Sequence, residues 1–118
     1  MKVQKYHIYV ANLNPQSYKE EPGKERPVVV IQSDLLNKYH SSTVVCPLTT
    51  QVIDKPLPIR VQIRKSTLNR LSEHSAILVD QIRSVSNQRL VRHLGELTAQ
   101  ERQELVSKLQ DLLIEDWI

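Results

Sequence analysis

Five short runs of apolar and mostly β-branched residues constrain the fold more than any other feature of this sequence. Each run has four to six residues, and polar or proline-containing stretches separate them. Runs of this length and composition are typical of strands. The sequence therefore predicts five strands, at residues 8–11, 27–32, 43–48, 59–63 and 75–79.

The apolar patterns of these runs differ. Residues 59–63 alternate apolar and polar side chains, which indicates one solvated face. Residues 27–32 and 75–79 are almost continuously apolar, which indicates strands buried on both sides. We expect a curled antiparallel sheet, in a fold that is mainly β with some α (α+β).

Three helices are also predicted. Residues 33–39 and 66–71 each begin with serine and are long enough only for short connecting helices. Thr98 and Glu101 form a capping box, which predicts a helix from about Ala99 to Glu115. Its apolar positions 105, 106, 109, 112, 113 and 117 form one stripe, which we expect to cover a sheet or a subunit interface.

Composition excludes several classes of function. The 118 residues fit one domain spanning 1–118, and no apolar run approaches a membrane span, so we expect a cytoplasmic protein. Two glycines cannot supply a phosphate-binding loop or a dinucleotide fingerprint. Cys46 is the single cysteine, and the four histidines are scattered, so neither an intrachain disulfide nor a structural zinc is expected. We expect no cofactor.

Charge is distributed unevenly along the chain. Residues 1–93 hold 14 Lys and Arg against 7 Asp and Glu, whereas residues 94–118 hold 2 against 6. A basic body of this kind suits contact with phosphates or with an acidic protein segment. It is equally compatible with an ordinary soluble surface.

Residues 14–25 form a long polar stretch without periodicity, and long loops in compact domains are commonly functional. Arg26 follows it directly and could grip a phosphate, or could be a strand-end charge kept in water. Thr49, Thr50 and Gln51 end the third predicted strand, where threonine hydroxyls are usually turn formers. The residues alone leave both alternatives open.

Four segments occur in a characteristic order and spacing, namely NLNP at 12–15, RPVVVIQ at 26–32, PLTTQ at 47–51 and VDQIRSV at 79–85. In combination they resemble the motifs of the MazF/PemK toxin family, which are ribosome-independent mRNA interferases of toxin–antitoxin modules. The resemblance runs from about Lys5 into the C-terminal helix.

The resemblance implies a homodimeric SH3-like barrel with short connecting helices and a C-terminal helix, which cuts single-stranded RNA at a short sequence without a metal ion. A cognate antitoxin would hold it inactive by laying an acidic tail in the RNA groove. The family's catalytic residues fall on Arg26 and Thr49, and Asp80 matches a position that serves as a catalytic base or contacts RNA bases. The predicted RNA-binding residues are Lys19, Glu21, Lys24, Thr50, Gln51 and Gln81.

This chemistry agrees with the residues present, because RNA supplies its own nucleophile in the 2′-OH and needs only proton transfer and charge stabilisation. The general base could be Arg26 or Asp80, and Asp80 could instead be a carboxylate paired with Arg83.

The chain also departs from the family pattern. Tyr6-His7 replaces the usual Gly-Asp, Asn12 replaces an Asp, and Lys19-Glu20 replaces Gly-Ser. A catalytically silent RNA-binding relative is therefore an alternative. Another is a gyrase poison on the same barrel, which Trp117-Ile118 superficially resembles.

Overall fold

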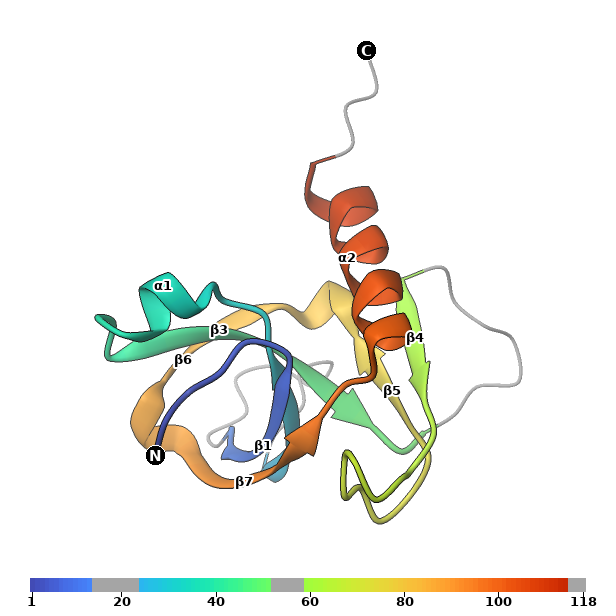
Figure 1. The fold of residues 1–118 in the computed structure, drawn as a ribbon, viewed down its shortest axis with the longest axis horizontal. Helices are drawn as coiled ribbons and strands as arrows, with labels where there is room; N and C mark the ends of the chain where they lie inside the picture. Colours follow the sequence, from blue (N-terminus) through green and yellow to red (C-terminus); the bar gives the residue numbers. More distant parts are fainter. Residues whose placement is uncertain (14–23, 52–58, 115–118) are drawn as a thin grey trace.

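The computed structural model describes residues 1–13, 24–51 and 59–114. Strands make up most of the fold and a long helix follows the last of them, which is the α+β arrangement expected from the sequence (Figure 1). The elements are β1 (His7–Asn12), β2 (Glu25–Val30), α1 (Asp34–Asn37), β3 (Ser42–Thr49), β4 (Arg60–Ile63), β5 (Ser75–Leu78), the 3-10 helix η1 (Val79–Gln81), β6 (Arg83–Ser86), the 3-10 helix η2 (Asn87–Arg89), β7 (Leu90–Glu96) and α2 (Ala99–Leu113).

The strands form one antiparallel sheet in the order β4-β5-β3-β2-β1-β7, and β6 pairs with β3. The sheet curls on itself, and α2 stands over the side that carries β4 and η1 (Figure 1). Both of its faces are apolar. The helix-side cluster comprises Ile8, Val29, Cys46, Leu48, Val61, Ile63, Leu71, Ile77, Val79, Leu97 and Leu105. The opposite cluster comprises Tyr9, Ala11, Leu13, Val28, Val30, Val45, Val85 and Leu90.

The central strands contribute to both clusters through simple alternation. Val28 and Val30 belong to the opposite cluster and Val29 to the helix-side cluster, and all three are fully buried. The predicted burial of residues 27–32 on both faces is confirmed for these three valines. The predicted alternation of β4 is also confirmed, because Val61 and Ile63 are buried and Gln62 is exposed between them.

Strands β5 and β6 lie end to end along one edge of β3 with a bulge between them. Leu48 pairs with Ile77 and Val45 pairs with Arg83, so three steps along β3 correspond to six along its partner. The three extra residues match the length of η1, Val79–Gln81. Bulges of this kind re-aim side chains out of a sheet.

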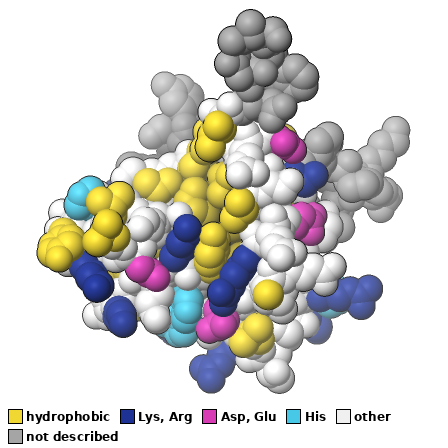
Figure 2. Space-filling view, turned by 45° about the horizontal axis from the view of Figure 1, so that its top comes forward, with side chains coloured by type: hydrophobic (Ala, Val, Ile, Leu, Met, Phe, Trp, Pro, Cys, Tyr) yellow, Lys and Arg dark blue, Asp and Glu magenta, His cyan; other side chains and the backbone are white. Residues whose placement is uncertain are grey.

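Helix α2 begins as predicted, because the Thr98 hydroxyl accepts from the Glu101 N–H and the Glu101 carboxylate accepts from the Thr98 N–H. Leu105 is fully buried, whereas Leu113 and Ile114 are exposed. In the view of Figure 2, further hydrophobic side chains lie on the surface, including a group over α1 at the left. Within the described residues, no helix is long and apolar enough to cross a membrane.

Two expectations need correction. Strands β6 and β7 were not predicted, because each is rich in polar side chains and owes its conformation to pairing with β3 and β1. The predicted helix at 66–71 is wrong. There the Asn69 side chain accepts from the N–H groups of Ser66 and Leu71, and Arg70 has a φ of 55°. This local bonding competes with helical hydrogen bonds and forms a turn.

Candidate active site

The pairing between β2 and β3 stops short of the ends of both strands. Its last pair joins Val28 to Pro47, and continuing that register by two places sets Arg26 opposite Thr49. On its other edge, the end of β3 pairs with β5 through Leu48 and Thr49. Pro27 and Pro47 have no N–H with which to extend the β2–β3 ladder. The two predicted catalytic residues therefore lie near the ends of neighbouring strands, where the pairing between β2 and β3 has ceased.

The Arg26 side chain enters this gap and is half-buried. Its Nη1 donates a long hydrogen bond of 3.4 Å to the carbonyl oxygen of Leu48. Its Nε is buried and, among the described residues, has no hydrogen-bond partner. Burial lowers the pKa of the guanidinium. A buried cation with an unused N–H is suited to receive an anionic oxygen.

The Thr49 hydroxyl has one described hydrogen bond, in which its Oγ1 accepts from the N–H of Gln51 at 3.2 Å. This contact closes a short turn at the strand end. The hydroxyl proton remains available for donation to a ligand. Thr50 and Gln51 follow the end of β3 and are exposed. Both can be reached by a ligand bound at this strand end.

Asp80 and Gln81 lie on the bulge formed by η1, along the edge of β3 that faces away from β2. Burial, followed by the negative charge of Asp80, raises the pKa of the Cys46 thiol to about 12. Asp80 is therefore close to the middle of β3. Among the described contacts, none joins Asp80 to Arg26, and no salt bridge joins it to Arg83.

The base of the long polar loop lies at the same end of the sheet as Arg26. Lys24 accepts through its carbonyl from the N–H of Leu13 at 2.9 Å, and Arg89 donates through Nη1 to the carbonyl of Asn12 at 3.0 Å. Arg89 was not predicted, because its position depends on β7, which sequence patterns did not reveal. Lys19 and Glu21 lie outside the described residues.

Residues 1–13, 24–51 and 59–114 contain no group of three His, Cys, Asp or Glu side chains arranged to hold a metal ion. What the strand ends offer instead is a guanidinium, a hydroxyl and several main-chain groups. Such an arrangement can bind a phosphodiester and stabilise extra negative charge on it.

Comparisons with known proteins point to one group. Residues 4–113 match the model for the PemK-like, MazF-like toxin of type II toxin–antitoxin systems. A curated endoribonuclease MazF from Staphylococcus saprophyticus is 36% identical over 98 residues, which cover 83% of this chain and 80% of that protein.

Solved structures agree with that match. MazF from Deinococcus radiodurans superposes with a TM-score of 0.78 at 27% identity, covering 93% of this chain and 94% of its own. A MazE–MazF structure from the same organism superposes with a TM-score of 0.76 at 25% identity, covering 98% and 100% of the two chains. The predicted fold is therefore confirmed.

Proposed function

The chain belongs to the PemK-like, MazF-like toxin family of type II toxin–antitoxin systems, and on that premise we propose that it is a single-domain endoribonuclease toxin that cleaves single-stranded RNA at a specific sequence. The observation that carries this proposal is the half-buried guanidinium of Arg26, with its unused Nε–H, beside the strand end that bears Thr49. The β2–β3 register supports the proposal, because its continuation sets Arg26 opposite Thr49.

The reaction we propose is transesterification without a metal ion. The 2′-oxygen forms a bond to phosphorus and the bond to the 5′-oxygen breaks, giving a 2′,3′-cyclic phosphate and a 5′-OH. The 2′-OH proton passes to a base, and the leaving oxygen gains a proton. Arg26 and Thr49 donate to the phosphorane oxygens.

The identity of the base depends on position and pKa. Burial lowers the pKa of Arg26, which brings the guanidinium closer to a role in proton transfer. Asp80 lies on η1, along the edge of β3 that faces away from β2 and Arg26. We therefore assign proton transfer to Arg26, and contact with RNA bases to Asp80 and Gln81. The further proposed RNA-binding residues are Lys19, Glu21, Lys24, Thr50 and Gln51.

We also propose that the toxin is a cytoplasmic homodimer inhibited by a cognate antitoxin. A MazE–MazF structure among the relatives supports the antitoxin. The exposed Leu113 and Ile114 at the end of α2 support association with another chain, because exposed apolar groups of this kind mark interaction surfaces.

The test is to incubate a long RNA with the purified protein in EDTA and to analyse the products. We expect cleavage by the wild type, none by Arg26→Ala, and undiminished cleavage by Arg60→Ala. Arg60 is the matched control because it is also a half-buried arginine on a strand with an unpaired Nε. Abolition by EDTA would contradict the mechanism. RNA retention without cleavage would favour the silent relative, and trapping of gyrase would favour the poison.

A single 2′-deoxy substitution on the 5′ side of the cut provides a second test. It should block cleavage and weaken binding only slightly, because the phosphates that meet the basic surface remain. Efficient cutting of that oligonucleotide would show that water is the nucleophile.

A further inference from the structure

The dipeptide Tyr6-His7, at the start of β1, is a place where this chain departs from its family, and the cleavage mechanism makes no use of it. Tyr6 has a φ of 67°, in the left-handed region that favours glycine. Its ring lies 4.8 Å from the Lys5 Nζ and 5.4 Å from the Arg102 guanidinium. The Tyr6 N–H also donates to the Val30 carbonyl at 2.7 Å, and its carbonyl accepts from the Leu97 N–H at 3.1 Å, so main-chain hydrogen bonds fix this residue and with it the position of His7.

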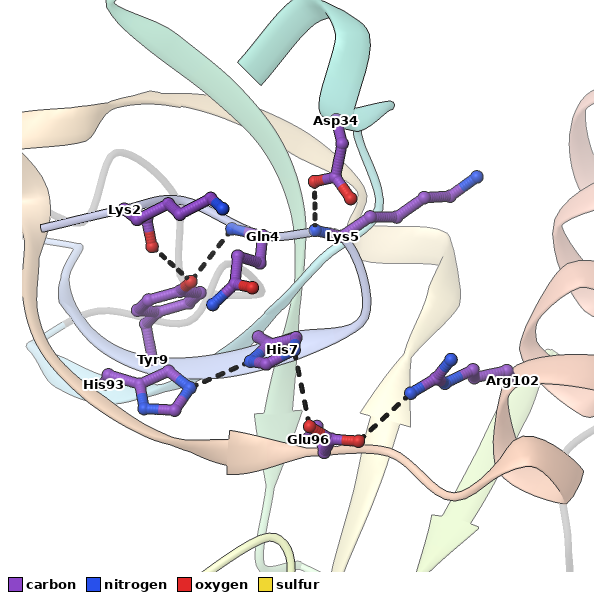
Figure 3. A network of polar contacts seen from close by, with 9 residues as sticks. All are labelled: Lys2, Gln4, Lys5, His7, Tyr9, Asp34, His93, Glu96 and Arg102. Atoms are coloured by element: carbon purple, nitrogen blue, oxygen red, sulfur yellow. Dashed lines mark hydrogen bonds and ion pairs between the residues drawn. The ribbon is translucent and has the colours of Figure 1, made fainter. Parts of the chain in front are cut away.

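His7 faces a second histidine on the neighbouring strand. Its Nδ1 lies 2.9 Å from Nε2 of His93 on β7, and the two ring centroids are 5.2 Å apart (Figure 3). The edge of Tyr9 packs against the His93 ring. Two imidazole nitrogens thus point at each other with space for one shared proton.

The far side of His7 is held by a carboxylate. Glu96 places Oε2 3.4 Å from the His7 Nε2, and its other oxygen lies 3.2 Å from Nη2 of Arg102 (Figure 3). A carboxylate on Nε2 favours the tautomer with its proton there, which leaves a lone pair on Nδ1. Metal-binding histidines are commonly oriented by such an outer carboxylate.

We propose that His7 and His93 form a two-histidine site for a divalent transition ion such as Zn²⁺ or Ni²⁺. The ion replaces the shared proton and binds Nδ1 of His7 and Nε2 of His93. Two ligands about 2.0–2.1 Å from an ion lie about 2.9–3.4 Å apart at right-angled or tetrahedral positions. The observed separation of 2.9 Å falls in this range, and the lone pairs, which now face each other, must each turn by about 45° to aim at a common ion.

Accessibility and ligand number set the strength of the site. His93 is exposed and can turn toward the ion, whereas the His7 side chain is 18% exposed and is held by Glu96. The described residues provide no third His, Cys, Asp or Glu ligand, so water fills the other positions. We therefore expect exchangeable binding in the micromolar to submillimolar range, much weaker than a four-ligand site.

This site is separate from the proposed cleavage site. His7 begins β1, whereas Arg26 lies opposite Ala11 near the other end of that strand. The four-residue separation corresponds to about 13 Å. An ion bound by both histidines would tether β1 to β7 and stabilise the fold, and cleavage would continue without it.

The test is calorimetric titration of the EDTA-dialysed full chain with ZnCl₂ and NiCl₂, together with thermal unfolding. We expect one ion per chain and a higher Tm, at least tenfold weaker binding in His93→Gln, and unchanged binding in the exposed control His40→Gln. Glu96→Gln should weaken binding about tenfold through loss of the orienting carboxylate. Shifts of the His7 and His93 imidazole ¹⁵N resonances on titration would identify the ligands.

Equal affinity in His93→Gln, or no binding at millimolar metal, would overturn the proposed site. RNA cleavage in EDTA is measured on the same samples. Loss of cleavage with intact metal binding would contradict the proposed function alone, and intact cleavage without metal binding would contradict the metal site alone.

Discussion

Asn69 and Arg26 are polar side chains in opposite hydrogen-bonding states. The Asn69 Oδ1 accepts from the N–H groups of Ser66 and Leu71, each at 3.0 Å, and its Nδ2 donates to the Arg64 carbonyl at 2.8 Å. Arg26 makes one described side-chain hydrogen bond, at 3.4 Å, and its buried Nε has no described partner.

This contrast indicates that Asn69 stabilises the fold, whereas Arg26 is available to bind a ligand. A buried amide whose oxygen and nitrogen are both hydrogen-bonded fixes the chain around it. A buried N–H without a partner costs free energy in the folded protein, and a bound anion recovers that cost. We call the turn at residues 66–71 the Asn69 corner. We expect changes at the Asn69 corner to lower the free energy of unfolding, and changes at Arg26 and Thr49 to lower the cleavage activity.

The largest effect should come from Gly95→Ala, because Gly95 packs against the Asn69 corner. A Cβ at this position would lie 2.7 Å from the Asn69 Cα and closer still to the Leu68 carbonyl oxygen. These are main-chain atoms that cannot turn aside, so we expect a loss of about 4 kcal/mol or more of unfolding free energy. Urea unfolding followed by circular dichroism measures it, with the exposed Gln100→Ala as control. A loss below about 1 kcal/mol would show that the corner can move.

Arg26→Ala should lower kcat roughly a hundredfold or more through loss of charge stabilisation. Stability should change little, because this truncation leaves no strongly bonded partner unpaired. Arg26→Lys should fail comparably, since an ammonium cannot reproduce the planar fork. Single-turnover cleavage and thermal unfolding are measured together. A large fall in Tm would place Arg26 with Asn69 as a structural residue.

Thr49→Ala should reduce cleavage about tenfold to a hundredfold, and Thr50→Ala should reduce it less. Thr49 ends β3 opposite the Arg26 position, whereas Thr50 lies beyond the strand. Cleavage rates of the two variants at saturating RNA decide the question. Equal effects would mean that the assigned register at this strand end is wrong.

Asn69→Ala should cost about 2 kcal/mol of stability, because it leaves buried main-chain groups without partners. Cleavage per folded molecule should be unchanged, which is the converse of the Arg26 result. Activity is therefore normalised to the folded fraction. A kcat defect in fully folded Asn69→Ala would break the distinction between the two regions.

Thr98→Ala should cost about 1 kcal/mol, because its hydroxyl caps α2 in a more exposed place. The difference between this loss and that of Asn69→Ala then measures how much burial increases the contribution of a hydrogen-bonded polar group to the free energy of unfolding. Chemical denaturation gives both numbers. A cost equal to that of Asn69→Ala would show that burial is not what sets the difference.

Some of this architecture could be predicted from local sequence. The three valines of β2 and the capping box of α2 depend on residues a few positions apart, and both are confirmed. The motif spacing also indicated Arg26 and Thr49, whose roles stay predictions. Their approach follows from one antiparallel register that ends at two prolines.

Other features depend on contacts that local patterns do not encode. The 66–71 segment has the composition of a helix, but Asn69 bonds to its neighbours' backbone and forms a turn. The His7–His93 contact joins residues 86 positions apart and requires β7, which was not predicted. Asp80 could not be placed because the pairing of β3 skips three residues at η1.

The odd number of residues in η1 has a consequence for insertions and deletions. Ile77 and Val85 are an even number of positions apart, so an uninterrupted strand would place them on the same face. Instead Ile77 joins the helix-side cluster and Val85 the opposite cluster, because three extra residues reverse the alternation. Loss of one residue here would turn Val85 to the wrong face, and loss of two would not. Viable length changes at this point in the gene should therefore come in steps of two codons.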